Sequence, residues 1–298
     1  MIVALFGFVI GAIFGSFGDV VANRLIANKS IWGRSYCLSC KKTLKWYDLF
    51  PFFSFLLLRG RCRYCHKKIA PEHFYVESGM GLLVALYFGL TPFSLATIGF
   101  NFLTALLLLK IVMAVFIILI STIVFITDLK TGYIFDKITY PAVGIALLLQ
   151  VAISAVQTGY FYTEFQKSPL AKYLMLPNST YLSSHYWLIW QPTILAIGLG
   201  VLLAAFFAAL IILTKGRGMG WGDVKYVLFI GLALGFPNGL LAVFLAFFSG
   251  AFFGVALLLI GKKQFGQTIP FGPFLSLGTI TALVWGNQIM DWYLHLGR

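Results

Sequence analysis

The sequence has little charge, and what it lacks excludes several classes of protein. Only 10% of its 298 residues are Asp, Glu, Lys or Arg, whereas 60% are hydrophobic and the mean hydropathy is +0.92. This composition excludes an ordinary water-soluble domain and is typical of a polytopic membrane protein. The chain also contains neither the Gly-x-x-x-x-Gly-Lys-Ser/Thr loop of nucleotide-hydrolysing proteins nor the His-Glu-x-x-His pair of zinc peptidases. Neither of those two chemistries is therefore supported.

The abundant feature is a set of long apolar runs. The weakest of them lies within 224–260, because Gly235-Phe-Pro-Asn-Gly239 interrupts it and its first half is short. The first run is expected to be a retained span, since no basic residue precedes it as in a signal peptide. We predict an all-α polytopic membrane protein of about eight transmembrane helices, because most of the runs approach the ~20 residues that a span needs. The expected spans are 2–25, 79–98, 102–127, 138–157, 188–214, 224–237, 239–260 and 271–291.

The basic residues are distributed unevenly over the loops between these runs. With eight spans, one side of the membrane receives most of the 22 Lys and Arg residues, and the other keeps only Lys167, Lys172 and Arg298. Because positive charge accumulates in cytoplasmic loops, we expect the first side to be cytoplasmic. The net charge of +13 follows from this orientation and from contact with anionic membrane lipid, and requires no nucleic acid.

All four cysteines lie in the one sizeable soluble segment on the basic side, residues 26–78, which we call the insert. They form two Cys-x-x-Cys pairs, and this spacing predicts a tetrahedral structural zinc site in a zinc-ribbon-like fold. Two disulfides are the alternative, which a reducing cytoplasm disfavours. His66 and His73 flank the second pair and are expected at the surface rather than among the ligands. The predicted zinc ligands are Cys37, Cys40, Cys62 and Cys65.

Two aspartates lie at the edges of apolar runs, where an ionisable side chain is costly and marks a functional site. Asp128 follows the run 111–127, and Asp223 lies in Gly218-Met-Gly-Trp-Gly-Asp-Val-Lys225. In the predicted topology both fall at the cytoplasmic face. Two adjacent carboxylates share one proton, so that one can activate water while the other donates a hydrogen bond to a carbonyl. We therefore predict that Asp128 and Asp223 form a catalytic pair for peptide hydrolysis.

Other residues near the aspartates are candidates for supporting the site. Gly222 and its neighbouring glycines permit close approach of a backbone, with a flexible turn as the alternative. Lys225 either biases the carboxylate pair electrostatically or sets the topology. Asp136 closes the loop that Asp128 opens, and it also suits a helix N-terminus, where the dipole favours a carboxylate.

The first span carries Ser16, Asp19 and Asn23 at helical spacing. Polar residues on one face of an apolar helix have to point into the bundle or into a wet cavity. For Ser16, interhelical hydrogen bonding is the favoured interpretation. Asp19 is a third buried carboxylate, which would either perturb the catalytic pair or bind a cationic group of the substrate.

Several motifs occur in order along nearly the whole chain. They are Gly15-Ser-Phe17 with Arg24, the two Cys-x-x-Cys pairs with 57–65, Glu77, Asp128 with Ile134-Phe-Asp136, 218–225, and Ile269-Pro-Phe-Gly-Pro-Phe274. In these motifs the chain resembles the type IV prepilin peptidases, a family of membrane aspartic peptidases. It departs from the family at Phe135, where the family usually has proline, and at Asp19, where it usually has asparagine.

The resemblance implies that Asp128 and Asp223 are the catalytic dyad and that Glu77 belongs to the site. The substrates would be prepilins or pseudopilins, helices embedded in the membrane whose basic leader is cut after a glycine. Relatives with the cysteine insert resemble methyltransferases that use S-adenosylmethionine on the new amino terminus. The chain would then comprise a first transmembrane helix (1–25), the zinc-binding insert (26–78) with its interfacial segment, and a peptidase core (79–298).

Two other functions remain open from the sequence. A membrane transferase could use Asp128, Asp136 and Asp223 to bind a divalent cation and a lipid pyrophosphate, although no tight Asp-x-x-Asp motif is present. An ion-coupled transporter could use Asp19, Lys110 and the same aspartates, although few polar residues lie at mid-bilayer and no internal repeat is evident. Loss of peptide cleavage on substitution of Asp223 would disfavour the transporter, and activity without magnesium would disfavour the transferase.

Overall fold

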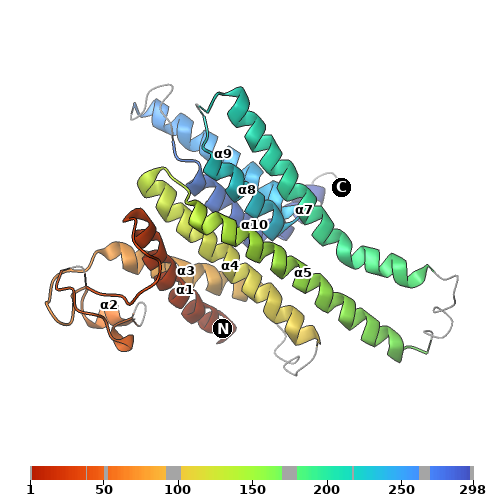
Figure 1. Ribbon diagram of the computed structural model, residues 1–298, viewed down its shortest axis with the longest axis horizontal. Helices are drawn as coiled ribbons and strands as arrows, with labels where there is room; N and C mark the ends of the chain where they lie inside the picture. Colours follow the sequence, from red (N-terminus) through yellow and green to blue (C-terminus); the bar gives the residue numbers. More distant parts are fainter. Residues whose placement is uncertain are drawn as a thin grey trace. The chain divides into compact units, whose positions relative to one another are not determined.

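The computed structural model describes residues 2–37, 39–49, 53–91, 102–169, 180–216, 218–261 and 269–295. Within these ranges the chain is helical and has no β-strand, only two isolated bridges in the insert, which confirms the predicted all-α class. The chain divides into two compact units, drawn in the colours of the sequence in Figure 1. Unit 1 comprises Met1–Phe93 and Val115–Phe135, and unit 2 comprises Ser94–Ala114 and Asp136–Arg298.

Six helices in the described ranges are long and apolar enough to cross a membrane. The helix α8 (Trp221–Leu234) has 14 residues, about 21 Å in length, and so is shorter than the ~30 Å hydrocarbon core. The helix α10 (Gly272–His295) is longer but is not among the six. The protein is therefore an integral membrane protein, while the full count of eight spans stays a prediction. The six are α1 (Ile2–Ile26), α3 (Pro71–Leu90), α4 (Phe102–Thr131), α5 (Asp136–Lys167), α7 (Tyr181–Leu213) and α9 (Asn238–Leu259).

The second helix begins earlier than its apolar run. The structure starts α3 at Pro71 rather than at residue 79, so Glu72, His73 and Glu77 lie on this helix and not in a loop of the insert. Pro71 suits the first turn of a helix, and Ala70 before it is extended with φ −60° and ψ 132°. Hydropathy marks only the apolar part of a helix, and for that reason it missed this polar first turn.

In unit 1, α1 and α3 pack closely through glycines (Figure 1). A Cβ atom on Gly11 would lie 2.6 Å from the carbonyl oxygen of Met80, and one on Gly15 would lie 3.1 Å from the Cα of Glu77. A Cβ atom on Gly7 would lie 3.0 Å from the Cγ atom of Phe88. This small-xxx-small pattern lets membrane helices approach without intervening side chains. We call the contact the glycine seam; it fixes the polar face of α1 against the start of α3.

In unit 2, α8 lies among α5, α7, α9 and α10 (Figure 1). A Cβ atom on Gly231 would lie 2.5 Å from the Cα of Gly200 on α7. The amide of Gln150 on α5 donates to the carbonyl of Leu232 at 3.0 Å. The buried hydroxyl of Tyr226 lies 3.1 Å from the hydroxyl oxygen of a serine on α10. Close packing and interhelical hydrogen bonds therefore hold α8, and with it Asp223, in place within unit 2.

The segment 46–58 of the insert is too short and interrupted to span the membrane and is expected to be interfacial or re-entrant; it contains two short elements. A 3₁₀ turn, η1 (Trp46–Leu49), is followed by α2 (Phe53–Leu57), and residues 50–52 between them lie outside the described ranges. Leu56 and Leu57 on α2 are exposed. Exposed leucines next to membrane helices are typical of a segment that lies on the bilayer surface.

Candidate functional site

Asp128 lies in the last turn of α4 and is only 5% exposed. The C-terminal end of a helix carries partial negative charge, so a carboxylate is disfavoured there. Burial adds a further cost for the charged form. The structure therefore buries an ionisable side chain at the edge of this apolar helix, and the catalytic role of Asp128 stays a prediction.

Asp223 is the third residue of α8 and is 7% exposed. One oxygen of its carboxylate accepts a hydrogen bond from the backbone N–H of Gly220 at 3.1 Å. This contact caps the helix, and the positive end of the helix dipole favours the carboxylate. Asp128 and Asp223 belong to different units, so their pairing remains a prediction.

The loop before α8 presents bare backbone beside Asp223. Gly216 has φ +74°, a left-handed conformation that favours glycine. Gly218 and Gly220 differ, because no described atom would lie closer than 3.9 Å to a Cβ atom added at either of them. Packing within the described chain therefore does not require glycine there. The predicted role of these glycines, close approach of another backbone, is compatible with this geometry.

The candidate supporting residues Lys225 and Asp136 contact each other within unit 2. The Lys225 ammonium donates to the Asp136 carboxylate at 2.6 Å and lies 4.9 Å from the ring centre of Tyr140. Asp136 is the first residue of α5, as expected for an acid at a helix N-terminus. The pair joins the starts of α5 and α8, so Lys225 holds the first turn of the helix that carries Asp223.

The four cysteines converge in the insert. The Sγ atoms of Cys37, Cys40, Cys62 and Cys65 all lie within 4.8 Å of one another, and those of Cys37 and Cys65 are 3.9 Å apart. Four thiolates around a tetrahedral zinc, with Zn–S distances of about 2.3 Å, place their sulfur atoms roughly 3.8 Å apart. The cluster fits a structural zinc ion, as the spacing of the motif predicts.

The two cysteine pairs are built in the same way. The N–H of Cys37 donates to the carbonyl of Lys42 at 3.0 Å, and the N–H of Cys62 donates to that of Lys67 at 2.9 Å. The fourth residue after each of these cysteines, Lys41 and His66, is left-handed with φ near +55° (56° and 55°). The repeated geometry presents the sulfur atoms of both pairs to one point, which is how a zinc ribbon holds its metal.

The charge state of the thiols also favours a cation. The backbone N–H of Cys40 lowers the pKa of the Cys37 thiol to about 6. The backbone near Lys67 has the same effect on Cys65, but desolvation and the neighbouring thiols outweigh it and raise the pKa of Cys65 to about 11. Four clustered thiols therefore cannot all ionise unless a cation balances their charge.

A buried carboxylate holds the second cysteine pair against η1. The side chain of Asp48 is 4% exposed; it accepts hydrogen bonds from Arg63 at 2.7 Å, from the Tyr64 hydroxyl at 2.9 Å and from the Lys45 N–H at 3.2 Å. Burial raises the pKa of Asp48, but these donors outweigh burial and hold it below its usual value. The same contact raises the pKa of Tyr64 to about 12.

We expect Asp48→Asn to loosen the insert by about 1–3 kcal/mol, because a carboxylate with charged and neutral donors is replaced by a neutral amide. The measurement is hydrogen exchange over residues 45–64 in the full chain, with Asp291→Asn on α10 as the matched control. Since the folded pKa of Asp48 is lowered, its contribution is complete above the unfolded pKa of about 4 and is lost as the pH falls through the folded value. Unchanged exchange in Asp48→Asn at neutral pH would contradict this role.

The structure pairs Asp19 with a histidine. The Nδ1 atom of His73 on α3 contacts one carboxylate oxygen of Asp19, and the Asn23 amide donates to the other at 2.9 Å. His73 does not belong to the cysteine cluster, as expected, and its side chain stays partly exposed; it also contacts α1, because α3 begins at Pro71. Ser16, Asp19 and Asn23 line a cavity of about 900 Å³ within unit 1, so the polar face of the first span borders this cavity. The supporting candidate Glu77 lines the same cavity.

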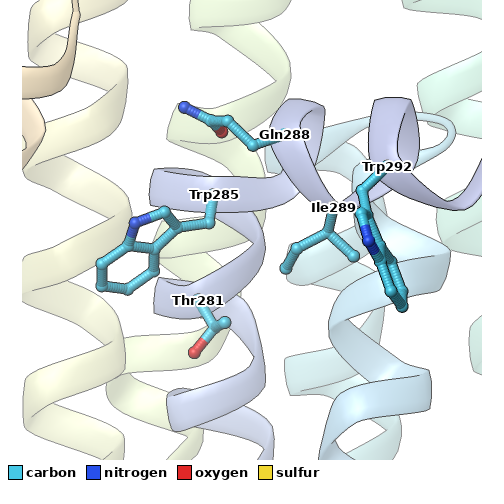
Figure 2. A pocket seen from close by; sticks show the side chains of 5 residues that line it. All are labelled: Thr281, Trp285, Gln288, Ile289 and Trp292. Atoms are coloured by element: carbon cyan, nitrogen blue, oxygen red, sulfur yellow. The ribbon is translucent and has the colours of Figure 1, made fainter.

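A second, smaller hollow of about 280 Å³ lies on α10 (Figure 2). Figure 2 shows Trp285 and Trp292, two turns apart on the helix, with Ile289, Thr281 and Gln288. None of the five side chains is titratable. Tryptophan at the end of a membrane helix is typical of the interfacial aromatic belt, so this hollow is a poor candidate for a catalytic site.

Several charges used for the predicted orientation lie outside the described residues. They are Lys172, Arg217, Lys262, Lys263 and Arg298.

Two family models match the chain. The model described as "Bacterial Peptidase A24 N-terminal domain" matches residues 9–90, and "Type IV leader peptidase family" matches residues 111–255. Curated relatives named "Prepilin leader peptidase/N-methyltransferase" include one from Aeromonas hydrophila, 31% identical over 88% of this chain and 74% of its own. Another, from Bacillus subtilis, is 28% identical over 97% of both chains. No solved structure matches the chain significantly.

Proposed function

The chain belongs to the type IV leader peptidase family, a family of aspartic peptidases, and from this membership we propose its substrate and its catalytic residues. It is a membrane-embedded aspartic endopeptidase. It cuts the basic leader of prepilins or pseudopilins after a glycine, at the cytoplasmic face, with Asp128 and Asp223 as the dyad. It then methylates the new amino terminus from S-adenosylmethionine.

The observation that carries the peptidase proposal is the burial of two carboxylates at the ends of apolar helices. Asp128 ends α4 and Asp223 begins α8, and both are less than one tenth exposed. One ionised carboxylate accepts a proton from water, which attacks the scissile carbonyl carbon. The other, protonated, donates a hydrogen bond to the carbonyl oxygen and later passes its proton to the leaving amine. Neither step requires a nucleophilic side chain.

The position of the aspartates suits a substrate that is itself a membrane helix. Because each aspartate lies at the end of an apolar helix, the cleaved bond of such a substrate would lie at the boundary of the bilayer. The bare backbone at Gly218 and Gly220 leaves room beside Asp223 for an extended peptide.

We assign the cysteine cluster to a structural zinc ion. All four tetrahedral positions would be taken by the thiolates of Cys37, Cys40, Cys62 and Cys65, so the ion would have no open position for a substrate. Its contribution would be the folding of the insert.

The proposed placement in the membrane follows the positive-inside rule. The insert and both aspartates lie on the cytoplasmic side of the bacterial inner membrane, and the membrane lipid is a partner along the apolar helices. No nucleic acid is required. We retain the division into a first helix (1–25), an insert (26–78) and a peptidase core (79–298), although α3 starts inside the second of these segments.

Intact-protein mass spectrometry of a prepilin co-expressed with this chain tests the function. We expect the prepilin to lose its leader up to the glycine and to gain about 14 Da on the new terminus, the mass of one CH₂ from a single N-methylation. An uncut leader on two different pilin-like substrates, from a correctly inserted chain, would contradict the peptidase proposal. The same outcome would direct attention to the transferase or transporter alternatives.

A further inference from the structure

The cavity of unit 1 has no role in peptide cleavage as proposed above. Its volume of about 900 Å³ lies in the range of small-molecule sites. Its walls are α1, the start of α3 and the insert, and Cys37 and Cys62 of the zinc cluster are among its lining residues. We propose that this cavity is the methyl-transfer site, in which His73, held by Asp19, removes the proton from the new amino terminus beside S-adenosylmethionine. The inference rests on the proposed methyltransferase function, to which it assigns a place and residues.

The helical wall of the cavity carries more carboxylates than cations, with Arg24 of α1 as the one Lys or Arg among the lining residues of this wall. Asp19 on α1 and Glu72 and Glu77 on α3 all line it. Both groups that have to meet for methyl transfer, a sulfonium and an amino terminus, carry positive charge when they arrive. Carboxylates attract both and reduce the repulsion between them. An acidic wall is therefore the chemistry that this pair of reactants requires.

The wall contributed by the insert is basic and aromatic. Lys67 and Lys68 follow the second cysteine pair, and Trp32 and Tyr36 precede the first. Arg24 fixes this wall, because its guanidinium donates to the carbonyl of Ile31 at 2.5 Å and to that of Gly33 at 2.9 Å. Cationic side chains suit the carboxylate of S-adenosylmethionine, and an aromatic face suits its adenine.

The Asp19–His73 pair is arranged as a proton acceptor. Asp19 is 4% exposed and contacts Nδ1 of His73, which favours the imidazole with its proton on that nitrogen. Nε2 then carries the lone pair. The His73 side chain is 38% exposed and lines the cavity, so an amine within the cavity can approach it. A buried aspartate that orients a histidine in this way is a recurring device for general-base chemistry.

The cavity adjoins the end of α4 that carries Asp128. Lys130, two residues after Asp128, forms an ion pair with Glu72 at 2.5 Å, and Glu72 lines the cavity. All three residues belong to unit 1. Lys130 therefore links the end of α4 that carries Asp128 to a lining residue of the cavity.

The transfer step balances without a further reactant. Nε2 of His73 accepts a proton from the amino terminus, and the freed nitrogen lone pair attacks the methyl carbon. A carbon–nitrogen bond forms as the carbon–sulfur bond breaks, and the electron pair of that bond leaves the sulfur as a neutral thioether. The methylated amine carries the positive charge that the sulfonium has lost.

Photo-crosslinking of methyl-labelled S-adenosylmethionine to the full chain in lipid nanodiscs tests the site without any substrate. We expect the label in peptides that cover residues 16–36 and 62–77, and competition by S-adenosylhomocysteine. Ala27→Trp, which places an indole at the lining residue Ala27, should reduce the labelling at least tenfold. Label confined to residues 102–295, or undiminished label in Ala27→Trp, would overturn the inference.

The second measurement is the methylated fraction of cut prepilin. We expect His73→Gln to lower this fraction at least about 100-fold, in line with the contribution of a general base. The matched control is His185→Gln on α7, which stacks on Phe161 within unit 2 and should leave the fraction within twofold. A fraction within twofold of wild type in His73→Gln would overturn the assignment of the base. A wild-type chain that is labelled in the cavity but cuts no prepilin would refute the proposed peptidase function and leave the donor site standing.

Discussion

Substitution of either Asp128 or Asp223 by Asn is expected to lower the rate of leader cleavage by about 10²–10⁴-fold, because an amide can neither accept a proton from water nor donate one to the leaving amine. Each carboxylate is less than one tenth exposed, so bulk water cannot readily replace it. Cleavage of a purified prepilin by the full chain in lipid nanodiscs is the measurement. Asp291→Asn, an exposed aspartate on α10, supplies the same chemical change without an expected loss.

The two variants can be distinguished from misfolded proteins by their stabilities. Asp128→Asn removes a negative charge from the negative end of α4, so it should leave the stability unchanged or raise it by up to about 1 kcal/mol. Asp223→Asn keeps a side-chain oxygen that can accept the Gly220 N–H, so the helix cap survives. A stable variant that does not cut is the expected result for both. Retained cleavage in either would refute the dyad, and a large loss of stability in Asp128→Asn would indicate a structural role.

The second large effect is expected at the cysteine cluster. Binding of structural zinc contributes roughly 10–16 kcal/mol in small zinc domains, so its loss should unfold the insert. Cys62 is the buried member of the four, and Cys62→Ser should release the metal and abolish slow hydrogen exchange over residues 36–69. We expect the methylated fraction of cut prepilin to fall more than cleavage does, since the insert contributes lining residues to the cavity and neither catalytic aspartate is among them.

The measurements for the cysteine variant are zinc content by elemental analysis, hydrogen exchange and the two product masses. His66→Gln is the control, because His66 directly follows Cys65 of the second cysteine pair and does not belong to the cluster. Full zinc content in Cys62→Ser would contradict the assignment of this ligand. A wild-type chain that contains no zinc, and whose intact mass is lower by the four hydrogen atoms that two disulfides remove, would support the disulfide alternative instead. Equal loss of cleavage and methylation would show that the insert also positions the peptide.

The parts of the site that the sequence predicted are local in the chain. Two Cys-x-x-Cys pairs specify a metal cluster through spacing alone, and the sulfur atoms do converge. Asp128 and Asp223 are candidates because a charge at the end of an apolar run is conspicuous; the structure buries both, and their catalytic role stays a prediction. The length and number of the apolar runs likewise predicted an all-α membrane protein.

The parts that the sequence did not predict depend on contacts between distant residues. His73 lies 54 positions from Asp19, and the sequence does not predict their contact, because the first turn of α3 is too polar to register as part of a span. Pro71, a favoured residue for a first helical turn, was the signal that could have placed it on the helix. Lys225 and Asp136 lie 89 positions apart, and nothing in either local motif indicates their contact.

The glycine seam between α1 and α3 separates two ways in which a change can harm this enzyme. A side chain at Gly11 would collide with the backbone of α3 at 2.6 Å, which no rotation of a neighbouring side chain can relieve. A substitution there would act during biogenesis, because α1 and α3 could not pack together and the misfolded chain would be degraded. The membrane would then contain less enzyme, and the activity of each remaining molecule would be normal. Changes at Asp19 or His73 would leave a full complement of enzyme with altered products. Protein abundance in the membrane therefore separates the two kinds of lesion before any assay of activity.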